Sequence, residues 1–218
     1  MDLKQMLKES ALELGIELTQ KNLDQLWIFK DFLKGYNEKV NLTAIKEDED
    51  IVIKHFLDSL TVLPYVDGKV IDVGTGPGFP GIVLKIVKPC LDITLLDARG
   101  KKVKFLEEAA ELLNLENIAC IHGRAEEISP QKGFSQSFDC AVSRAVGSFE
   151  NLAKWCLPFV KEGGQFIAMK GPNYEEELEE GKRALRRHGG AEINVQSLTL
   201  PQTDLARNLI IIKKSRVL

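Results

Sequence analysis

Residues 69–81 read KVIDVGTGPGFPG, and this stretch decides the fold. Its first five residues are largely apolar, which is typical of a short buried strand. Glycines follow at positions 74, 76, 78 and 81, and a helix is expected to begin near Ile82. Glycine reaches positive φ without strain and lets the backbone approach a ligand where a Cβ would collide. Each glycine costs chain entropy on folding, and a tight turn alone does not require four of them. The stretch therefore indicates a ligand-binding loop.

Strands and helices alternate on the C-terminal side of this loop. Further strands are expected at 92–96, 118–121, 138–142 and 164–169, and helices at 101–113, 151–160 and 175–187. Two last strands, at 192–200 and 209–213, are joined by a polar turn and suit a hairpin. Alternation of this kind, with short and nearly continuous apolar strands, argues for a parallel sheet with helices on both faces. We predict an α/β fold with a Rossmann-like, mostly parallel seven-stranded sheet and an antiparallel C-terminal hairpin.

The chain on the N-terminal side of the loop is predicted to be helical. Helices are expected over 3–14 before Gly15, from the candidate N-cap Thr19 to Gly35, and over 50–63 before Pro64. Since no strand pattern occurs in this part, we expect two units. Residues 1–66 form a helical N-terminal subdomain, and residues 67–218 form the ligand-binding domain.

Composition excludes several functional classes. The chain has 218 residues and a formal net charge of −3, so any nucleic-acid surface must be a local patch. No apolar run approaches the roughly 18 residues needed to span a bilayer, and the N-terminus lacks the apolar block of a signal peptide. The four cysteines form no Cys-x-x-Cys pair, and no His/Asp/Glu cluster has metal spacing. We therefore expect a cytoplasmic protein without a metal site.

Two classes of nucleotide compete for the loop. Gly76, Gly78 and Gly81 satisfy the G-x-G-x-x-G pattern, which leaves a nicotinamide-dependent oxidoreductase as an alternative. Asp72 precedes the glycines, and a carboxylate there repels a pyrophosphate but attracts the cationic methionine part of S-adenosylmethionine. Asp97 ends the second strand, where it is placed to accept hydrogen bonds from ribose hydroxyls. We predict S-adenosylmethionine as the cofactor, with Asp72, Gly76 and Asp97 in its site.

Further motifs carry a resemblance that covers nearly the whole chain. Besides the loop they are Tyr36-Asn37, Asn41-Leu42-Thr43-Ala44-Ile45, His55-Phe56-Leu57-Asp58-Ser59-Leu60, Leu96-Asp97 with Lys101-Lys102, Arg124-Ala125-Glu126, Ser143-Arg144-Ala145 and Lys170-Gly171. With these motifs the sequence resembles the bacterial 16S ribosomal RNA guanine-N7 methyltransferases, also called the glucose-inhibited division protein B family. The resemblance implies methylation of N7 of a single guanine in the decoding-centre loop, giving 7-methylguanosine.

The resemblance also implies site residues. The family's cofactor contacts fall on Gly74, Phe79, Ala125, Glu126 and Arg144. Because guanine N7 carries a lone pair and no proton, no general base is expected. Arg144 is a candidate for orienting the substrate or the cofactor, with a plain structural ion pair as the alternative. His55 and Asp58 lie three apart on one helix, and they either shape the cofactor pocket or form a buried polar pair.

The implied partner is 16S rRNA within the small ribosomal subunit. No DNA or membrane partner is expected, and the chain is expected to act as a monomer. The candidate RNA-facing residues are Arg99, Lys101, Lys102, Lys104, Arg183, Arg186, Arg187, Arg207, Lys213, Lys214 and Arg216. Two alternatives stay open. One is a ribosome-assembly or other RNA-binding factor that retains the fold, and the other is a methyltransferase with a different acceptor.

Overall fold

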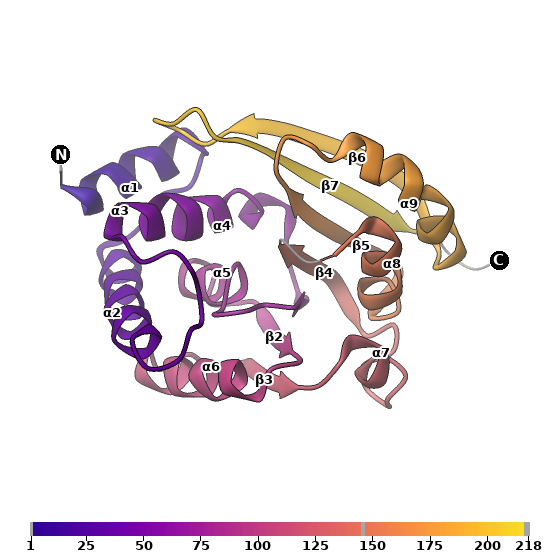
Figure 1. Ribbon diagram of the computed structural model, residues 1–218, viewed down its shortest axis with the longest axis horizontal. Helices are drawn as coiled ribbons and strands as arrows, with labels where there is room; N and C mark the ends of the chain where they lie inside the picture. The colour runs from indigo at the N-terminus through magenta and orange to yellow at the C-terminus, as the bar shows by residue number, and fades with distance from the viewer. Residues whose placement is uncertain (1, 145–146, 216–218) are drawn as a thin grey trace.

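A seven-stranded sheet forms the centre of the molecule (Figure 1). The computed structural model describes residues 2–144 and 147–215, so Ala145 and Arg216, both named above, lie outside the described residues. The strands are β1 (Lys69–Val73), β2 (Asp92–Asp97), β3 (Ile118–His122), β4 (Phe138–Arg144), β5 (Val160–Lys170), β6 (Gly190–Thr199) and β7 (Ala206–Lys214). Their order across the sheet is β3-β2-β1-β4-β5-β7-β6. Strands β1 to β5 pair in parallel, whereas β7 is antiparallel to both β5 and β6. The predicted sheet and its antiparallel hairpin are confirmed.

Helices cover both faces of this sheet (Figure 1). They are α5 (Gly81–Val87), α6 (Gly100–Leu112), α7 (Ala125–Ile128), α8 (Phe149–Cys156) and α9 (Glu175–Arg187). Side chains of β1 alternate between two buried clusters, because successive residues of a strand point to opposite faces. Val70 packs with α5, α6 and the N-terminal helices, whereas Ile71 packs with α8 and α9. This double burial explains why the parallel strands read as apolar runs.

The first two helices differ in how well the sequence predicted their ends. Helix α1 (Leu3–Glu13) stops before Gly15, whose φ is +76°. Helix α2 (Gln20–Asn37) begins at the predicted N-cap, since Thr19 and Asn22 form a capping box. The prediction that α2 ends at Gly35 is wrong. The helix continues because Tyr36 packs edge-on against Phe105 of α6, at 5.1 Å between ring centroids, and such packing outweighs the roughly 1 kcal/mol that glycine costs in a helix.

The predicted helix at 50–63 is a composite element. It comprises α3 (Asp48–Ile51), a π-helical segment η1 (Val52–Leu57), α4 (Asp58–Leu60) and a 3-10 turn η2 (Leu63–Tyr65). It begins two residues before the predicted start, and Pro64 lies inside η2 instead of following the helix. Proline is tolerated there because the first residues of a helical turn need no N–H donor. Hydrophobic spacing does not distinguish a π-helical turn from an α-helical one, so η1 was not predicted.

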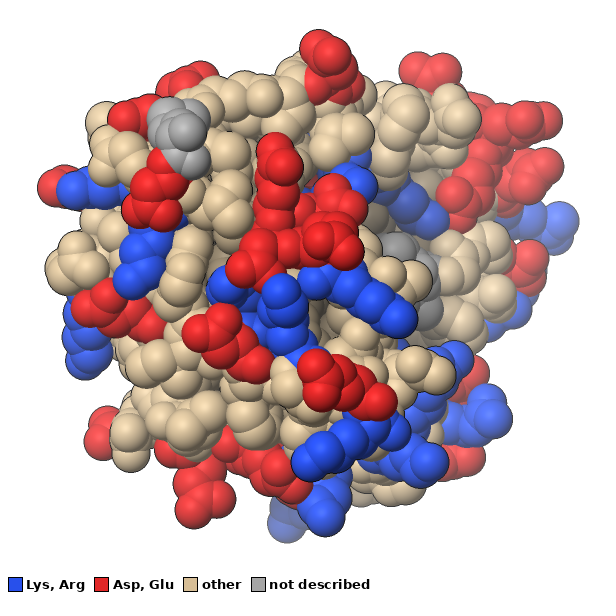
Figure 2. Space-filling model, turned by 60° about the vertical axis from the view of Figure 1, so that its left-hand side comes forward, with Lys and Arg blue, Asp and Glu red and all other residues tan. Residues whose placement is uncertain are grey.

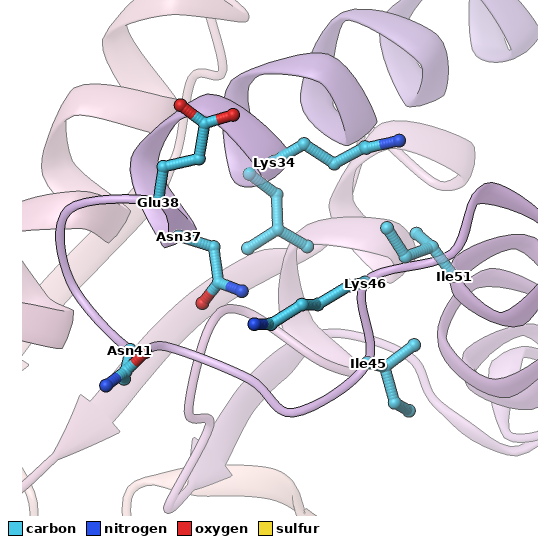
Figure 3. A pocket seen from close by; sticks show the side chains of 8 residues that line it. Lys34, Asn37, Glu38, Asn41, Ile45, Lys46 and Ile51 are labelled. Atoms are coloured by element: carbon cyan, nitrogen blue, oxygen red, sulfur yellow. The ribbon is translucent and has the colours of Figure 1, made fainter.

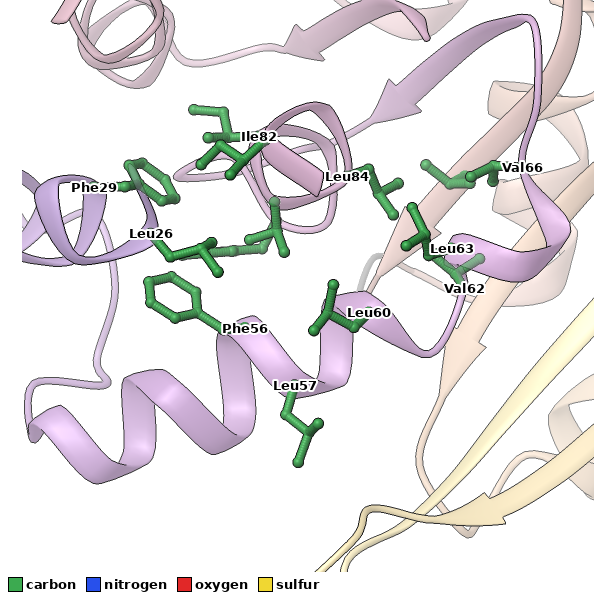
Figure 4. Close-up of a cluster of buried hydrophobic side chains, with 14 of the residues drawn as sticks. Leu26, Phe29, Phe56, Leu57, Leu60, Val62, Leu63, Val66, Ile82 and Leu84 are labelled. Atoms are coloured by element: carbon green, nitrogen blue, oxygen red, sulfur yellow. The ribbon is translucent and has the colours of Figure 1, made fainter. Parts of the chain in front are cut away.

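The N-terminal helices share a hydrophobic core with the sheet. Figure 4 shows Leu26 and Phe29 of α2 beside Phe56, with Ile82 of α5 across the same cluster. The cluster extends from Leu7 in α1 to strand residues of the sheet, so residues 2–66 pack as a cover over one face. A boundary between residues 66 and 67 stays a prediction.

Two general properties follow from residues 2–144 and 147–215. Within these ranges no helix is long and apolar enough to cross a membrane. The same ranges hold no group of three or more His, Cys, Asp or Glu side chains arranged to hold a metal ion. The four cysteines are free thiols, and Cys140 and Cys156 are buried.

Candidate functional site

The glycine loop lies at the carboxyl edge of the sheet, between β1 and α5. Gly74, Gly76 and Gly78 have φ of +73°, +62° and +94°, a region that disfavours side chains. Gly81 has a different constraint, because a Cβ there would lie 2.9 Å from the carboxylate of Asp72 and would also press on Leu95. The loop therefore needs glycine for two physical reasons, backbone conformation at three positions and close packing at the fourth.

Asp72 ties the two ends of this loop together. Its Oδ2 accepts hydrogen bonds from Thr75 Oγ1 (2.6 Å) and from the Gly81 backbone N–H (2.8 Å). The side chain is fully buried, and Oδ1 has no hydrogen-bond partner among the residues that the structure describes. Burial raises the pKa of this carboxyl to about 6, against the smaller lowering effect of its hydrogen bonds. In this structure Asp72 organises the loop, a role that the sequence did not indicate.

The raised pKa of Asp72 predicts a pH-dependent effect of Asp72→Asn on the ligand-free chain. The folded carboxyl holds its proton up to about pH 6, whereas an unfolded one loses it near 3.8. The free energy of unfolding therefore falls as pH rises through this window, by about 3 kcal/mol. Asparagine keeps an acceptor oxygen but never ionises. Between pH 4 and pH 7, urea unfolding should show the stability of the variant rising relative to the wild type by roughly 2 kcal/mol, because part of the change already falls below pH 4. If the free energies of unfolding of the variant and the wild type changed with pH in parallel, the raised pKa of Asp72 would be contradicted.

Asp97 connects the glycine loop to a cavity of about 200 Å³. Its Oδ2 accepts from the Gly76 N–H (2.9 Å), and its Oδ1 accepts from the Arg99 N–H (2.9 Å). The cavity is lined by Val73, Gly74, Leu96, Asp97, Ala98, Gly123, Arg124, Ala125, Glu126 and Trp155. A carboxylate oxygen has more than one acceptor site, so Asp97 keeps capacity for ligand hydroxyls. The structure thus brings Gly74, Gly76, Asp97, Ala125 and Glu126 together, as the sequence analysis expected.

Trp155 of α8 also lines this cavity, and the sequence analysis missed it. Its indole N–H donates to Glu126 Oε1 at 2.6 Å. Glu126 therefore lines the cavity, and the hydrogen bond from Trp155 holds its carboxylate in place there. The sequence does place Trp155 in the helix after β4, which begins near the carboxyl edge of the sheet. A lone tryptophan in an amphipathic helix is, however, usually a packing residue.

Arg144, at the end of β4, reaches across to the N-terminal helices. Its Nη1 donates to Lys54 O (2.8 Å) and Asp58 Oδ2 (2.9 Å), and its Nη2 lies 2.9 Å from His55 Nδ1. The guanidinium also lies over the ring of Phe79, at 5.3 Å from the centroid. The side chain of Asp58 is 6% exposed, and it accepts a second ion pair from Arg207 Nε at 2.7 Å. His55 and Asp58 thus belong to one buried polar group with Arg144, and their part in shaping the cofactor pocket stays a prediction.

Phe79 joins this group to the glycine loop. The His55 ring stacks on Phe79 at 4.1 Å between centroids, with 12° between the planes. Phe79 is 2% exposed and also meets Phe29 and Phe56 of the core. Three segments that are distant in sequence, namely the His55 helix, the loop and β4, therefore meet in one cluster.

Comparison with known proteins identifies the family to which the chain belongs. The GidB family model, described as rRNA small subunit methyltransferase G, matches residues 22–209. The chain belongs to the GidB family. Ribosomal RNA small subunit methyltransferase G of Alkaliphilus oremlandii is 46% identical over 98% of this chain and 91% of that protein. The protein of the same name from Acetivibrio thermocellus is also 46% identical, over 98% of this chain and 89% of its own length.

Solved structures support the fold of this GidB family member. A protein from Methanococcus maripaludis, described as an S-adenosyl-L-methionine-dependent methyltransferase, aligns with a TM-score of 0.61 at 15% identity, over 87% of this chain and 93% of that one. M. jannaschii TYW2, solved in complex with AdoMet, aligns with a TM-score of 0.55 at 15% identity, over 71% of this chain and 73% of that one. At these identities the likeness concerns the fold alone. It agrees with the S-adenosylmethionine-dependent methyltransferase fold predicted from the sequence.

The GidB chain's carboxyl edge fits the cofactor that the loop predicts. Asp97 offers carboxylate oxygens at the cavity, Leu96 and Ala125 give it apolar walls, and Trp155 adds an aromatic one. The cavity begins at Gly74, at the end of β1, and Arg144 of β4 lies over Phe79 of the same glycine loop without lining the cavity itself. A site with a ribose acceptor, an apolar slot and charged groups beyond it matches the three chemical parts of S-adenosylmethionine.

The candidate RNA-facing residues divide between the two edges of the sheet. Arg99, Lys101, Lys102 and Lys104 lie at or near the start of α6, and Arg207 lies at the start of β7; both positions are at the carboxyl edge. Arg186, Arg187 and Lys213 lie toward the opposite edge, because α9 and β7 run back from the carboxyl edge. The expectation for Lys214 is wrong, because this residue is buried and its ammonium donates to Leu157 O and Val160 O. On the face in Figure 2, acidic side chains are interspersed among the basic ones.

A second hollow, of about 220 Å³, lies beside the Asn41–Ile45 motif (Figure 3). The residues that line it are Leu33, Lys34, Asn37, Glu38, Asn41, Ile45, Lys46 and Ile51. It is separate from the cavity at Asp97, since the two share no lining residue. In Figure 3 the loop that follows α2 crosses this hollow, with Lys46 directed toward Asn37.

Proposed function

We propose that this chain transfers the methyl group of S-adenosylmethionine to N7 of a single guanine in the decoding-centre loop of 16S rRNA. Membership of the GidB family supports the reaction class and the ribosomal RNA substrate. The observation that carries the proposal is the cluster of His55, Phe79 and Arg144, because it joins the family's N-terminal motifs to the glycine loop. A scaffold that merely kept the fold would have no need for that junction.

The cofactor is proposed to lie along the carboxyl edge from Arg144 to Trp155. Gly74 and Gly76 leave room for its backbone contacts, Asp97 accepts from the ribose, and Ala125 and Glu126 border the adenine. Phe79 and Asp72 shape the loop on the methionine side, beside Arg144. Arg144 retains donors that a cofactor can use, because its Nε–H and one Nη2–H have no hydrogen-bond partner within the described residues.

The chemistry requires little from the protein beyond placement. S-adenosylmethionine, when bound, supplies a methyl group on a sulfonium that already leaves readily. Guanine N7 presents an in-plane lone pair without a proton, so the chain need not provide a general base. Its residues act by holding the reacting atoms in line at about 3–3.5 Å. Arg144 is suited to orienting groups through its planar fork and is unsuited to stabilising the positive charge that develops on the purine.

The partner is proposed to be the small ribosomal subunit, met in the cytoplasm by a monomer of this chain. Single-stranded loop bases are presented to proteins by the folded RNA around them. The basic residues at the carboxyl edge, next to the cofactor cavity, are placed to contact phosphates.

A matched pair of substitutions tests which edge faces RNA. Lys101→Ala removes an exposed charge at the carboxyl edge, whereas Arg187→Ala removes one toward the opposite edge. We expect Lys101→Ala to weaken subunit binding and to reduce the slope of log affinity against log salt by roughly one. The slope for Arg187→Ala should match the wild type. Equal slopes for both variants would remove Lys101 from the interface.

The function is tested by transfer of labelled methyl groups to small subunits that lack the modification, followed by cleavage at 7-methylguanosine. A single labelled guanine near the decoding centre is the expected result, and protein-free RNA should be a poorer acceptor. Cofactor binding is read separately from Trp155 fluorescence in a Trp27→Phe background, which leaves one tryptophan of the two in the chain. Binding without transfer would favour an assembly factor, and transfer to another base would change the acceptor.

A further inference from the structure

The π-helical segment η1 frees a backbone acceptor for Arg144. In an α-helix Lys54 O would receive the Asp58 N–H, but here that N–H bonds to Ile53 O and His55 O. Lys54 O instead accepts from Arg144 Nη1 at 2.8 Å. His55 in the same segment and Asp58, the first residue of α4, also direct acceptor atoms at the guanidinium, so three acceptors of the composite helix face a single arginine.

The chemistry of these contacts fixes the tautomer of His55. Arginine can only donate, so His55 Nδ1 must accept from Arg144 Nη2, and the ring proton must lie on Nε2. That N–H then donates to Thr43 Oγ1 at 3.1 Å. Burial, together with the adjacent Arg144 charge, lowers the pKa of His55 to about 3, so the ring stays neutral at physiological pH.

Thr43 is itself held by the loop that follows α2. Its hydroxyl oxygen also accepts from the Ile45 N–H at 3.1 Å. Asn37, at the end of α2, accepts from the N–H groups of Leu42 (2.7 Å) and Thr43 (3.0 Å) and donates to Thr43 O (3.0 Å). The hydrogen-bonded chain therefore runs from Asn37 through Thr43 and His55 to Arg144.

We propose that Thr43 and His55 are positioning residues for methyl transfer, which hold the Arg144 guanidinium in the orientation that the cofactor requires. This inference rests on the proposed function. Among the described residues Asp58 is the one carboxylate in ion-pair contact with Arg144, and it is shared with Arg207. His55 adds no charge. Its contribution is a third fixed contact on a planar group, whose Nε–H and one Nη2–H have no hydrogen-bond partner within the described residues.

The proposal also gives the loop at residues 38–47 a role in the cofactor site. Because Thr43 belongs to this loop, a displacement of the loop breaks the hydrogen bond to His55 and loosens Arg144. The loop borders the hollow of Figure 3, so contacts made there by RNA would bear on the cofactor site through Thr43. Cofactor binding and substrate binding are then energetically coupled.

Thr43→Val tests the proposal, with Thr43→Ser as rescue and Thr61→Val as matched control. Valine keeps the shape of threonine and removes the hydroxyl. Thr61 is a buried threonine at the C-cap of α4, and its hydroxyl donates to Asp58 O without touching His55 or Arg144. We expect both valine variants to melt at lower temperature. Only Thr43→Val should weaken S-adenosylmethionine binding, by about tenfold, and lower kcat, while Thr43→Ser restores both.

A spectroscopic readout separates positioning from stability. The chain has three histidines, so the ¹⁵N resonances of His55 can be resolved by comparison with a His55→Gln variant. The wild type should show the Nε2–H tautomer throughout pH 5–8, and Thr43→Val should lose that single state. Equal cofactor affinity and kcat in the two valine variants would overturn the proposal. Because affinity and tautomer are measured without RNA, failure of the wild type to methylate subunits would refute the function and leave this test standing.

Discussion

Arg144→Ala is expected to abolish methyl transfer and to lower the free energy of unfolding by about 1–3 kcal/mol, the usual cost of leaving buried acceptors without their donor, since Asp58 keeps its ion pair with Arg207. The side chains of Arg144 and Asp58 are 14% and 6% exposed, so water replaces the lost charge poorly. Lys54 O and His55 Nδ1 also lose their donor. Urea unfolding and labelled-methyl transfer measure the two effects.

Arg144→Lys separates the effect on stability from the effect on methyl transfer, because it keeps the positive charge and loses the planar, forked set of guanidinium donors. Lysine can hold Asp58, but one ammonium cannot reach Lys54 O, His55 and a cofactor group together. We expect most of the stability to return while transfer stays at least about a hundredfold down, which corresponds to about 2.7 kcal/mol. Arg207→Ala is the matched control for the ion pair. It leaves the Arg144–Asp58 contact in place, so cofactor affinity should stay near the wild-type value. Normal transfer and normal cofactor affinity in Arg144→Ala would end the proposed role.

Asp97→Ala is expected to weaken S-adenosylmethionine binding by about 1.5–3 kcal/mol, or roughly 10- to 150-fold. The substitution removes the proposed acceptor for the ribose and also frees the N–H groups of Gly76 and Arg99. Titration calorimetry on the folded variant gives the affinity directly. Asp97→Asn controls for the loop, since its amide oxygen can still accept from the Gly76 N–H. A loss smaller than about threefold in Asp97→Ala would show that the ribose has another partner.

The sequence was most informative where one physical effect dominates. Strand β1 and helix α9 begin and end at the predicted residues, because an apolar run bounded by turns and a strongly amphipathic, charged helix leave few alternatives. The strand β5 begins earlier than the predicted residue 164, since Val160, which was assigned to a helix end, pairs with Phe138 of β4, and a register irregularity follows before Gln165 pairs with Cys140. Pairing with a neighbouring strand is a tertiary effect that local pattern does not contain.

The same limit applies to the candidate site. Gly74, Gly76 and Asp97 meet because parallel strands end at one edge, which a sequence of alternating strands and helices implies. The meeting of Arg144 with His55 spans 89 residues. The family resemblance implied Arg144 as a cofactor contact, whereas the helical spacing of His55 left its role open between the cofactor pocket and a buried polar pair. Lys214 reads as a basic surface residue next to Lys213, yet the strand turns alternate residues to opposite faces and buries its ammonium against two carbonyls. Trp155 likewise joins the cavity through helix packing alone.

The position of β7 between β5 and β6 sets an order in which the sheet can be assembled. Strand β6 hydrogen-bonds to β7 and reaches the parallel strands only through it. Residues 190–199 therefore have no place in the sheet until residues 206–214 have paired with residues 165–170. Strand β7 must therefore join before β6 or together with it, and until it does, the open edge of β5 stands exposed as a template for pairing with other chains.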